Sequence, residues 1–370
     1  MDDIREFLDG RRERTEVVDR LSLGYGRSPI TKAFSRSSYG LDITSRTTIP
    51  LPSNKVSQGV VFYTRPLLNL TTSNLLADRA TTPYSTDVKM SYLRMARALL
   101  DPIAARSDNP ITSPLVDEKN PFIPILSNYQ LSMSGWPDIN LNVHVSKEGL
   151  LKQQWSMYDT YNKYYGAWEM STTYKNVSGD PVGSLMELWA GYGVGVYMDE
   201  MKPRISSIIE DNIDYQTAIY RMTLSLDNRI INDIAKTIAF PTAITIGNNF
   251  NMSRDTHLAE TGDQIDVPWQ CIGAEYNDPI LMREFNATVI MFNPEMRDQL
   301  RPVNYVFVPL KYRQLFNHIS YPYINLDTNE LQWWVSKALF EELLPEEVEN
   351  INNYNDEAMS SNPRWLKEVA

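Results

Sequence analysis

Apolar and polar residues alternate in several short segments of the chain, and this alternation predicts β-strands with one dry face and one wet face. The clearest example is the segment at 139–145, where Ile139, Leu141, Val143 and Val145 share one side. Further strands are predicted at 59–66, 218–226, 242–246, 267–272, 287–292 and 303–310. The centre of the chain is therefore expected to be rich in β-structure.

Helical spacing of apolar residues predicts a smaller number of helices. Residues 87–100 place apolar side chains at three- and four-residue steps. Asp180 followed by Pro181 is typical of a helix N-terminus, and an apolar stripe follows from Val182 to Trp189. Residues 330–370 predict two short helices divided by Pro345. We expect these helices to be inserted between the strands or to follow them.

The proline and polar segments divide the chain into regions. Residues 1–58 lack clear apolar periodicity and contain Pro50 and Pro52, which predicts an extended N-terminal arm. Five prolines between 102 and 124 predict a long ordered loop. We therefore expect four parts: the arm at 1–58, a strand, helix and proline-rich loop at 59–130, a β-rich core domain at 131–330, and a helical tail at 331–370.

Composition narrows the class of protein. The chain has 370 residues, of which 42% are hydrophobic and 22% charged, as in folded proteins. Its net charge of -11 is not offset by a basic tract, which disfavours general binding to nucleic acid or to anionic membranes. A single cysteine excludes a disulfide framework within one chain. We find neither the apolar core of a signal peptide nor an apolar run of about eighteen residues, so we expect a reducing, soluble compartment.

The search for catalytic motifs gives little. GYGVGV at 191–196 superficially resembles a nucleotide-binding glycine loop, but it follows a helix, so we interpret it as a helix C-terminus that leads into a strand. Cys271 lies in a predicted strand and is interpreted as a core residue. The three histidines are scattered, and we find neither a P-loop nor an HExxH motif. We expect no enzyme activity, no catalytic residues, no metal and no cofactor.

One alternative from a different class remains open. The segment at 155–174 is rich in aromatic residues, which can stack on sugars. Glu169, Asp199 and Glu200 are the carboxylates that a glycosidase there would use. More generally, 21 Tyr, 8 Trp and 15 Met favour a protein that works through large contacts, because interfaces are enriched in these residues.

Three segments carry a resemblance to a known class of proteins: GVVFYTRPLLNL at 59–70, NPFIPILSN at 120–128 and CIGAEYNDPILMREFN at 271–286. They resemble virion structural proteins of contractile-tailed bacteriophages, in particular tail and baseplate components. The order of elements from Gln154 to Asn286 also resembles the fold shared by tail-tube, tube-initiator and hub proteins. The resemblance implies an α+β, β-rich fold: a tail-tube-like β-sandwich or barrel core with inserted helices, an extended N-terminal arm and C-terminal helices.

The resemblance also implies a place and partners. It implies a ring of like subunits, expected to be a hexamer, in the tail tube or baseplate, with other tail and baseplate proteins as neighbours. DNA would be only a passing, non-specific cargo, and no membrane is involved. The protein would be made in the host cytoplasm and reside in the virion tail. The additional arm and C-terminal helices suit a tube initiator or baseplate adaptor. One alternative is a baseplate wedge, neck or other connector without a tube fold. Another, from a different class, is a sugar-binding or carbohydrate-active tail protein.

Assembly is the mechanism that this interpretation predicts. Strand edges would pair between subunits, and the proline-rich loop at 101–128 and the terminal segments would clasp neighbours. Large apolar side chains and one arginine are the candidate interface anchors. They are Phe62, Tyr63, Arg65, Pro66, Phe122, Trp333, Trp334 and Trp365.

Overall fold

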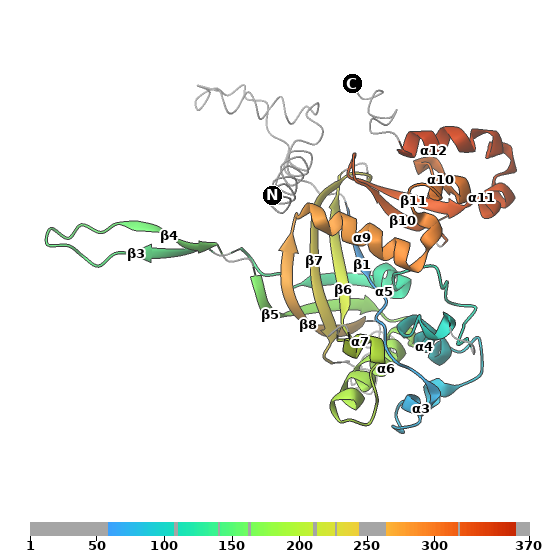
Figure 1. Ribbon diagram of the computed structural model, residues 1–370, viewed down its shortest axis with the longest axis horizontal. Coiled ribbons are helices and arrows are strands. Elements are labelled where there is room, and N and C mark those ends of the chain that lie inside the picture. Colours follow the sequence, from blue (N-terminus) through green and yellow to red (C-terminus); the bar gives the residue numbers. More distant parts are fainter. Residues whose placement is uncertain are drawn as a thin grey trace, which may run out of the picture.

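A curled antiparallel sheet forms the centre of the computed structural model (Figure 1), which describes residues 58–106, 110–139, 141–161, 164–209, 213–225, 228–243, 264–316 and 319–359. Six strands form this sheet. In spatial order they are β1 (Gln58–Tyr63), β6 (Thr217–Leu224), β7 (Ile231–Pro241), β8 (Gln264–Tyr276), β5 (Tyr164–Lys175) and β2 (Gln130–Ser134). Each neighbouring pair is antiparallel, with registers such as Phe62 opposite Tyr220 and Trp168 opposite Cys271.

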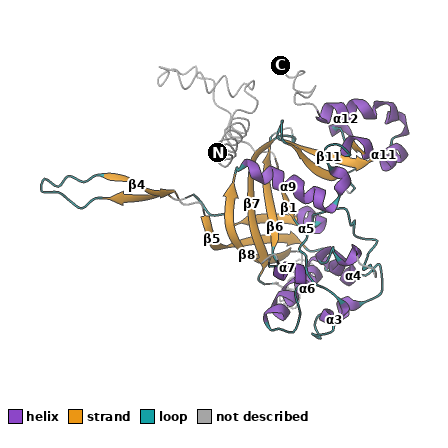
Figure 2. Cartoon of the chain, in the orientation of Figure 1, coloured by secondary structure: helices purple, strands orange, loops and turns teal. Residues whose placement is uncertain are grey.

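Two smaller sheets accompany the central one. The first has the order β10 (Tyr321–Asn325), β11 (Glu330–Ser336) and β9 (Tyr305–Phe307), and it packs near the C-terminal helices. The second is the hairpin of β3 (Leu141–Val145) and β4 (Ser156–Tyr161), which is inserted between β2 and β5. Figure 2 shows this hairpin standing away from the rest of the molecule.

The helices lie on both faces of the central sheet and beside the C-terminal sheet. Those described are α3 (Thr72–Leu75), α4 (Tyr92–Leu100), α5 (Pro124–Tyr129), α6 (Pro181–Tyr197), α7 (Ile205–Ile209), α9 (Pro279–Phe292), α10 (Arg301–Asn304), α11 (Lys337–Leu343) and α12 (Ile351–Met359). The two longest begin in the same way, with an aspartate cap followed by proline. Asp180 accepts from the Gly183 N–H, and Asp278 accepts from the Ile280 N–H, at 3.2 Å each.

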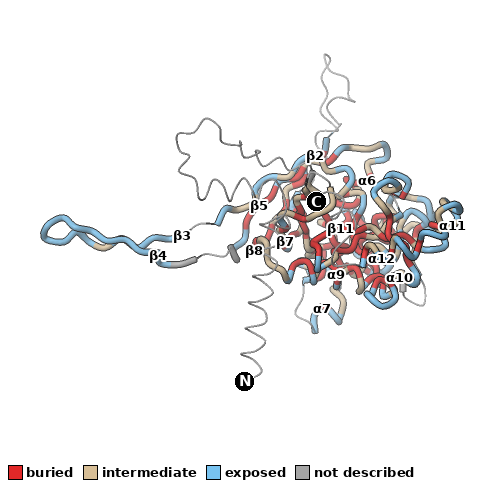
Figure 3. Tube along the Cα trace, turned by 90° about the horizontal axis from the view of Figure 1, so that it is seen from above, coloured by how far each residue is buried: buried red, intermediate tan, exposed pale blue. Residues whose placement is uncertain are grey.

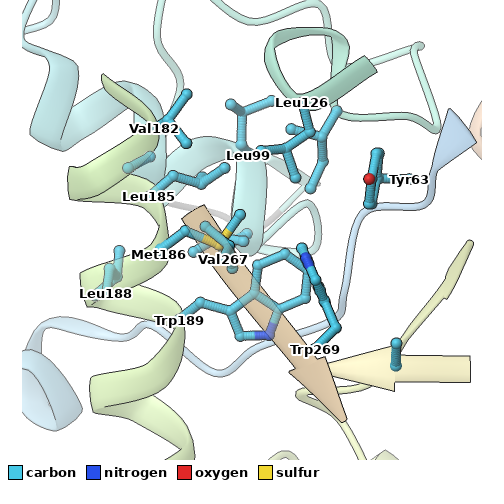
Figure 4. Close-up of a cluster of buried hydrophobic side chains, with 14 of the residues drawn as sticks. Tyr63, Leu99, Leu126, Val182, Leu185, Met186, Leu188, Trp189, Val267 and Trp269 are labelled. Atoms are coloured by element: carbon cyan, nitrogen blue, oxygen red, sulfur yellow. The ribbon is translucent and has the colours of Figure 1, made fainter. Parts of the chain in front are cut away.

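One face of the sheet builds the first hydrophobic core. Trp269 of β8 packs edge-on against Trp189 of α6, with ring centroids 5.6 Å apart. The same helix brings Leu185 and Met186 against this face, and Leu99 arrives from α4 (Figure 4). All these side chains are buried, which explains why α6 keeps the apolar stripe that its sequence predicts.

The other face builds a second core under α9 and the C-terminal sheet. Phe285 of α9 is fully buried and packs on Tyr220 of β6, with ring centroids 5.4 Å apart. Trp334 of β11 lies in the same cluster. The chain thus has the predicted α+β, β-rich architecture, with a curled sheet between two layers, and C-terminal helices as expected. The predicted arm at 1–58 lies outside the described residues, apart from Gln58.

The strands predicted at 59–66, 139–145, 218–226 and 267–272 are confirmed as β1, β3, β6 and β8. The helix predicted at 87–100 begins only at Tyr92, because the Ser91 hydroxyl caps it by accepting from the Leu93 N–H. The proline-rich segment is mostly loop, as predicted, but its last residues form α5 with Pro124 at the first helical position.

Several predictions were wrong. Residues 287–292 are not a strand but the end of α9, whose buried side chains Leu281, Phe285 and Val289 recur at helical spacing. The segment at 191–196 does not lead into a strand, since α6 continues to Tyr197. A side-chain carbon at Gly195 would lie 2.8 Å from Met201 Cγ, so this position needs glycine.

The remaining differences concern the strands around the C-terminal half. The strand predicted at 303–310 is limited to β9 at Tyr305–Phe307, because α10 precedes it. Residues 330–336 are strand β11 rather than helix. β7 was not predicted, and the strand predicted at 242–246 is not seen at 242–243, with 244–246 outside the described residues.

Candidate assembly surfaces

The hairpin of β3 and β4 is the first candidate surface, because its strands pair with each other and not with another described strand. Figures 1 and 3 show it projecting well beyond the body, and almost all of it is exposed. Val143 and Val145 form the face that the sequence predicts to be dry, yet both are more than half exposed. Trp155, directly before β4, and Tyr158 on β4 are exposed too. The described chain therefore leaves the apolar residues of this hairpin uncovered.

Hydrogen bonds hold the tip of the hairpin in a defined conformation. The Gly149 N–H donates to the Gln153 carbonyl at 3.0 Å, and the Lys152 N–H donates to the Gly149 carbonyl at 2.9 Å. At the base of the loop, the Ser146 N–H donates to the Trp155 carbonyl at 2.9 Å. The loop presents Leu150 and Leu151, which are 100% and 84% exposed. An ordered loop that displays two leucines to solvent is typical of a docking element rather than a simple turn.

The second candidate surface is the half of the central sheet that α9 does not cover. Lys236 on β7 donates to Glu284 on α9 at 2.5 Å, which places α9 over β6 and β7. Beyond this helix, β8, β5 and β2 turn a polar row outward: Glu169, Ser171, Thr173, Lys175, Asp266, Gln270, Ser132 and Ser134. Within this row, the Thr173 hydroxyl on β5 donates to the Asp266 carboxylate on β8 at 2.7 Å. It carries two acids and one lysine.

Most of the predicted interface anchors lie inside the chain. Phe122, Phe285 and Trp333 gather around Phe62, whose ring centroid lies 4.9 Å from that of Phe122, 5.1 Å from that of Phe285 and 6.2 Å from that of Trp333. Tyr63 and Trp334 are fully buried in the two separate cores. Pro66 is also buried, Trp333 is half-buried, and Trp365 lies outside the described residues. Their role as anchors between subunits stays a prediction.

Arg65 has a structural partner that its sequence context did not reveal. Its guanidinium donates to the carbonyls of Ala98 at 2.8 Å and Leu99 at 3.0 Å, and it lies 3.4 Å from the Glu118 carboxylate. The two carbonyls belong to the last turn of α4, where a cation is favoured by the helix dipole. Arg65 thus joins the end of β1 to α4.

The aromatic segment at 155–174 does not form one platform. Trp168 is buried in the first core and Tyr174 is fully buried there, whereas Trp155 and Tyr158 are exposed on the hairpin. Of the three carboxylates considered for glycosidase chemistry, Glu169 points to the outer face of the sheet. Asp199 and Glu200 follow α6 on the opposite face. Glu169 is therefore not placed to form a paired-carboxylate site with Asp199 or Glu200.

Other chemistry has little support among the described residues. Cys271 is fully buried, which agrees with its interpretation as a core residue. Burial also raises the pKa of its thiol to about 12. The described parts of the chain contain no cluster of three or more His, Cys, Asp or Glu side chains suited to a metal ion. No described helix is both long enough and apolar enough to cross a membrane.

The sequence did not single out the most exposed apolar residues. Leu150 and Leu151 lie in an otherwise polar loop, KEGLLKQQ. Two adjacent leucines in such a loop are the sequence feature that could have indicated their exposure. Ile205 and Ile208 on α7 are also exposed. Ser207 of the same helix and Ile213 line a groove beside α9. These residues became visible only when the fold placed them at the surface.

Comparison with solved structures finds weak likenesses to parts of contractile injection systems. The chain is similar to the anti-feeding prophage cap (AFP tube terminating cap), with 13% identity over 42% of this chain and 81% of that chain and a TM-score of 0.24. It is also similar to the PVC sheath/tube terminator in the extended state, with 11% identity over 42% of this chain and 86% of that chain and a TM-score of 0.23.

Comparison with sequences gives a clearer result. A search of curated protein sequences finds no significant match. The model of a family described as "Putative phage tail tube protein" matches residues 7–349, which is most of the chain. The chain therefore belongs to the phage tail tube protein family.

Proposed function

We propose that this protein is a non-enzymatic structural subunit of a phage tail, which assembles with like subunits into a ring of the tail tube or baseplate. The observation that carries the proposal is the projecting hairpin. Its apolar side chains, among them Leu150, Leu151, Trp155 and Tyr158, are exposed on the single chain. Exposed apolar surface of this kind is stabilised by contact with another protein. Membership of the tail tube family supports a second copy as that protein.

The uncovered polar half of the sheet suits the wall of a channel. Serine, threonine and glutamine side chains offer DNA phosphates weak contacts, and the charges of Glu169 and Asp266 outnumber that of Lys175. Phosphate binding depends on lysine and arginine, which release counterions from DNA. DNA would therefore slide past this face as a non-specific cargo. Six subunits and other tail proteins above and below are the assembly that the resemblance implies.

Solution mass tests the proposal directly. Light scattering over a concentration series, followed by electron microscopy, is expected to give rings or stacked rings with masses in multiples of the 42.5 kDa monomer. Trp155→Ser combined with Tyr158→Ser is expected to leave far-UV circular dichroism unchanged and to shift the protein toward monomer. Val348→Ser, at an exposed position near α12, is the matched control and is expected to assemble normally.

The outcome that opposes the proposal is equally plain. A wild-type protein that remains a monomer at every concentration, alone and mixed with its tail neighbours, contradicts a ring-forming role. Assembly that is unchanged in the hairpin variant would show that other surfaces join the subunits.

A further inference from the structure

A groove lies on the face of the central sheet that carries α9, between this helix and the segment at 213–216. It has a volume of about 530 Å³. Ala218 and Tyr220 of β6 line its floor, Thr288 and Met291 of α9 line one wall, and Ile213 lines the other. Figure 1 shows α9 and α7 on either side of this part of β6.

The charged side chains that line the groove already have partners within the chain. Lys236 is paired with Glu284, and Asp214 accepts a hydrogen bond of 2.5 Å from the Tyr192 hydroxyl. Arg65 is the fourth charged side chain of the lining, and it donates hydrogen bonds to carbonyls at the end of α4. A small charged ligand would have to compete with these bonds. The groove is therefore better suited to an apolar insert.

The rim of the groove is apolar and exposed. Ile213 and Met291 on its walls and Ile238 on its floor are each more than one third exposed. α7 contributes Ser207 to the lining, and Ile205 and Ile208 on the same helix are exposed. Figure 3 shows this helix standing out from the body. An apolar rim around a preformed cavity favours a partner that inserts one or two apolar side chains and covers the rim with more.

The tip of the hairpin has the matching properties. Leu150 is the most exposed large apolar side chain of those described, and Leu151 lies next to it. Lys152 directly follows these two leucines, while Lys147 and Glu148 precede them and cancel in charge. Glu284, whose side chain is 40% exposed against 17% for Lys236, is the more exposed partner of its ion pair at the groove. An apolar pair next to a lysine thus meets an apolar groove with an accessible carboxylate.

The tip and the groove of one chain lie on different sides of the molecule. The hairpin projects from one side of the body, while α7 and α9 lie on a different side of it (Figures 1 and 3). The five residues of β3, Leu141–Val145, span about 13 Å at roughly 3.3 Å per residue, and the loop with Leu150 lies beyond them. The tip therefore extends away from its own groove and reaches toward a neighbouring molecule.

We propose that the hairpin tip of one subunit, at Leu150 and Leu151, docks into the groove between α7 and α9 of a second copy of this chain. The two surfaces differ, so the contact is head-to-tail and repeats from subunit to subunit until a ring closes or a filament grows. The proposal rests on the assembly role inferred above and names the surface that receives the hairpin.

Cross-linking between two variants, each with one introduced cysteine, tests the contact. The natural Cys271 is fully buried, so an introduced surface thiol can be labelled selectively. Leu151→Cys and Met291→Cys are prepared separately, mixed, and treated with a flexible bismaleimide. The expected result is a covalent dimer that forms only in the mixture. Leu151→Cys mixed with Val348→Cys is the control, and its dimer yield is expected to be about tenfold lower.

Charge reversal gives a second readout that does not depend on cross-linker geometry. Glu284→Lys is expected to raise the concentration needed for half-assembly about tenfold, and Lys152→Glu in the same chain is expected to restore it to within about threefold of wild type. A tenfold change corresponds to about 1.4 kcal/mol of contact free energy.

The outcomes separate this proposal from the assembly role on which it rests. Rings that form while Leu151→Cys couples to Met291→Cys no better than to the control, and while Glu284→Lys assembles normally, would refute the groove as receptor and leave ring formation intact. A wild-type chain that does not assemble under any condition removes both proposals.

Discussion

Phe285 offers the sharpest test of how the second core is held together. It is fully buried on α9, and its ring centroid lies 4.9 Å from that of Phe122, 5.1 Å from that of Phe62 and 5.4 Å from that of Tyr220. Replacing a buried phenylalanine with alanine costs about 3–5 kcal/mol, because apolar contacts are lost and a cavity remains. Aromatic pairs stabilise a fold beyond the area that they bury, and Phe285 has three aromatic neighbours. We therefore expect Phe285→Ala to lower the free energy of unfolding by about 4 kcal/mol or more.

Thermal unfolding converts this free energy into a temperature. An unfolding entropy of about 2.1 cal/mol/K per residue gives about 0.8 kcal/mol/K for a chain of this length. Phe285→Ala should therefore lower the Tm by about 5 °C in a calorimetric scan. Ile280→Ala is the matched control, since Ile280 lies on the same helix but is more than half exposed, and its Tm should fall by about 1 °C or less.

The reasoning can fail in a recognisable way. If Phe285→Ala lowers the Tm by less than about 2 °C, the aromatic cluster does not tie α9 to the sheet as the packing implies. If both variants fall equally, helix propensity rather than burial governs the stability of α9.

Three further predictions concern a cap, a carboxylate and a thiol. Asp180→Ala should destabilise the protein by about 1 kcal/mol in urea unfolding, because α6 loses its cap, whereas Asp180→Asn should be close to neutral; equal losses would contradict capping. Hydrogen bonds from Tyr312 and Tyr354 lower the pKa of Glu347 from 4.5 to about 2. Its stabilising contribution is therefore present above pH 4.5 and is lost as the pH falls toward 2, so the difference in Tm between wild type and Glu347→Gln should shrink over that interval; a difference that stays constant would oppose this assignment. Cys271, with its raised pKa and full burial, should react with iodoacetamide at pH 8 only after unfolding, and rapid labelling of the native protein would contradict the packing.

Local signals in the sequence predicted the elements whose determinants are local. Asp180 and Pro181 mark the start of α6 because capping depends on adjacent residues alone. The same signal, Asp278 followed by Pro279, precedes α9, but the β-branched run near its end favoured a strand and led to the wrong prediction. Burial of the α9 stripe against another element decides between the two, and this information is not local.

Elements that depend on distant contacts were harder to predict. β7 carries Asp233 and Lys236 among its apolar residues, which obscures the strand pattern. The charge of Lys236 is accommodated by Glu284, which is 48 residues away in the chain. Large apolar residues such as Phe62 and Phe122 could be identified as important, but their packing against each other depends on the fold. For the same reason, the exposure of Leu150 could not be read from its sequence.

The isolation of the hairpin from the body makes its length an adjustable quantity. β5 and β8 are fixed in register by the core, whereas residues added to β3 and β4 would disturb no packed side chain of the described chain. Each residue added to both strands would extend the arm by about 3.3 Å but turn its faces over, and each pair of residues would extend it by about 6.6 Å with the faces retained. Such a hairpin could act as a ruler, so that related chains could change the spacing between assembled subunits in two-residue steps while keeping the same fold.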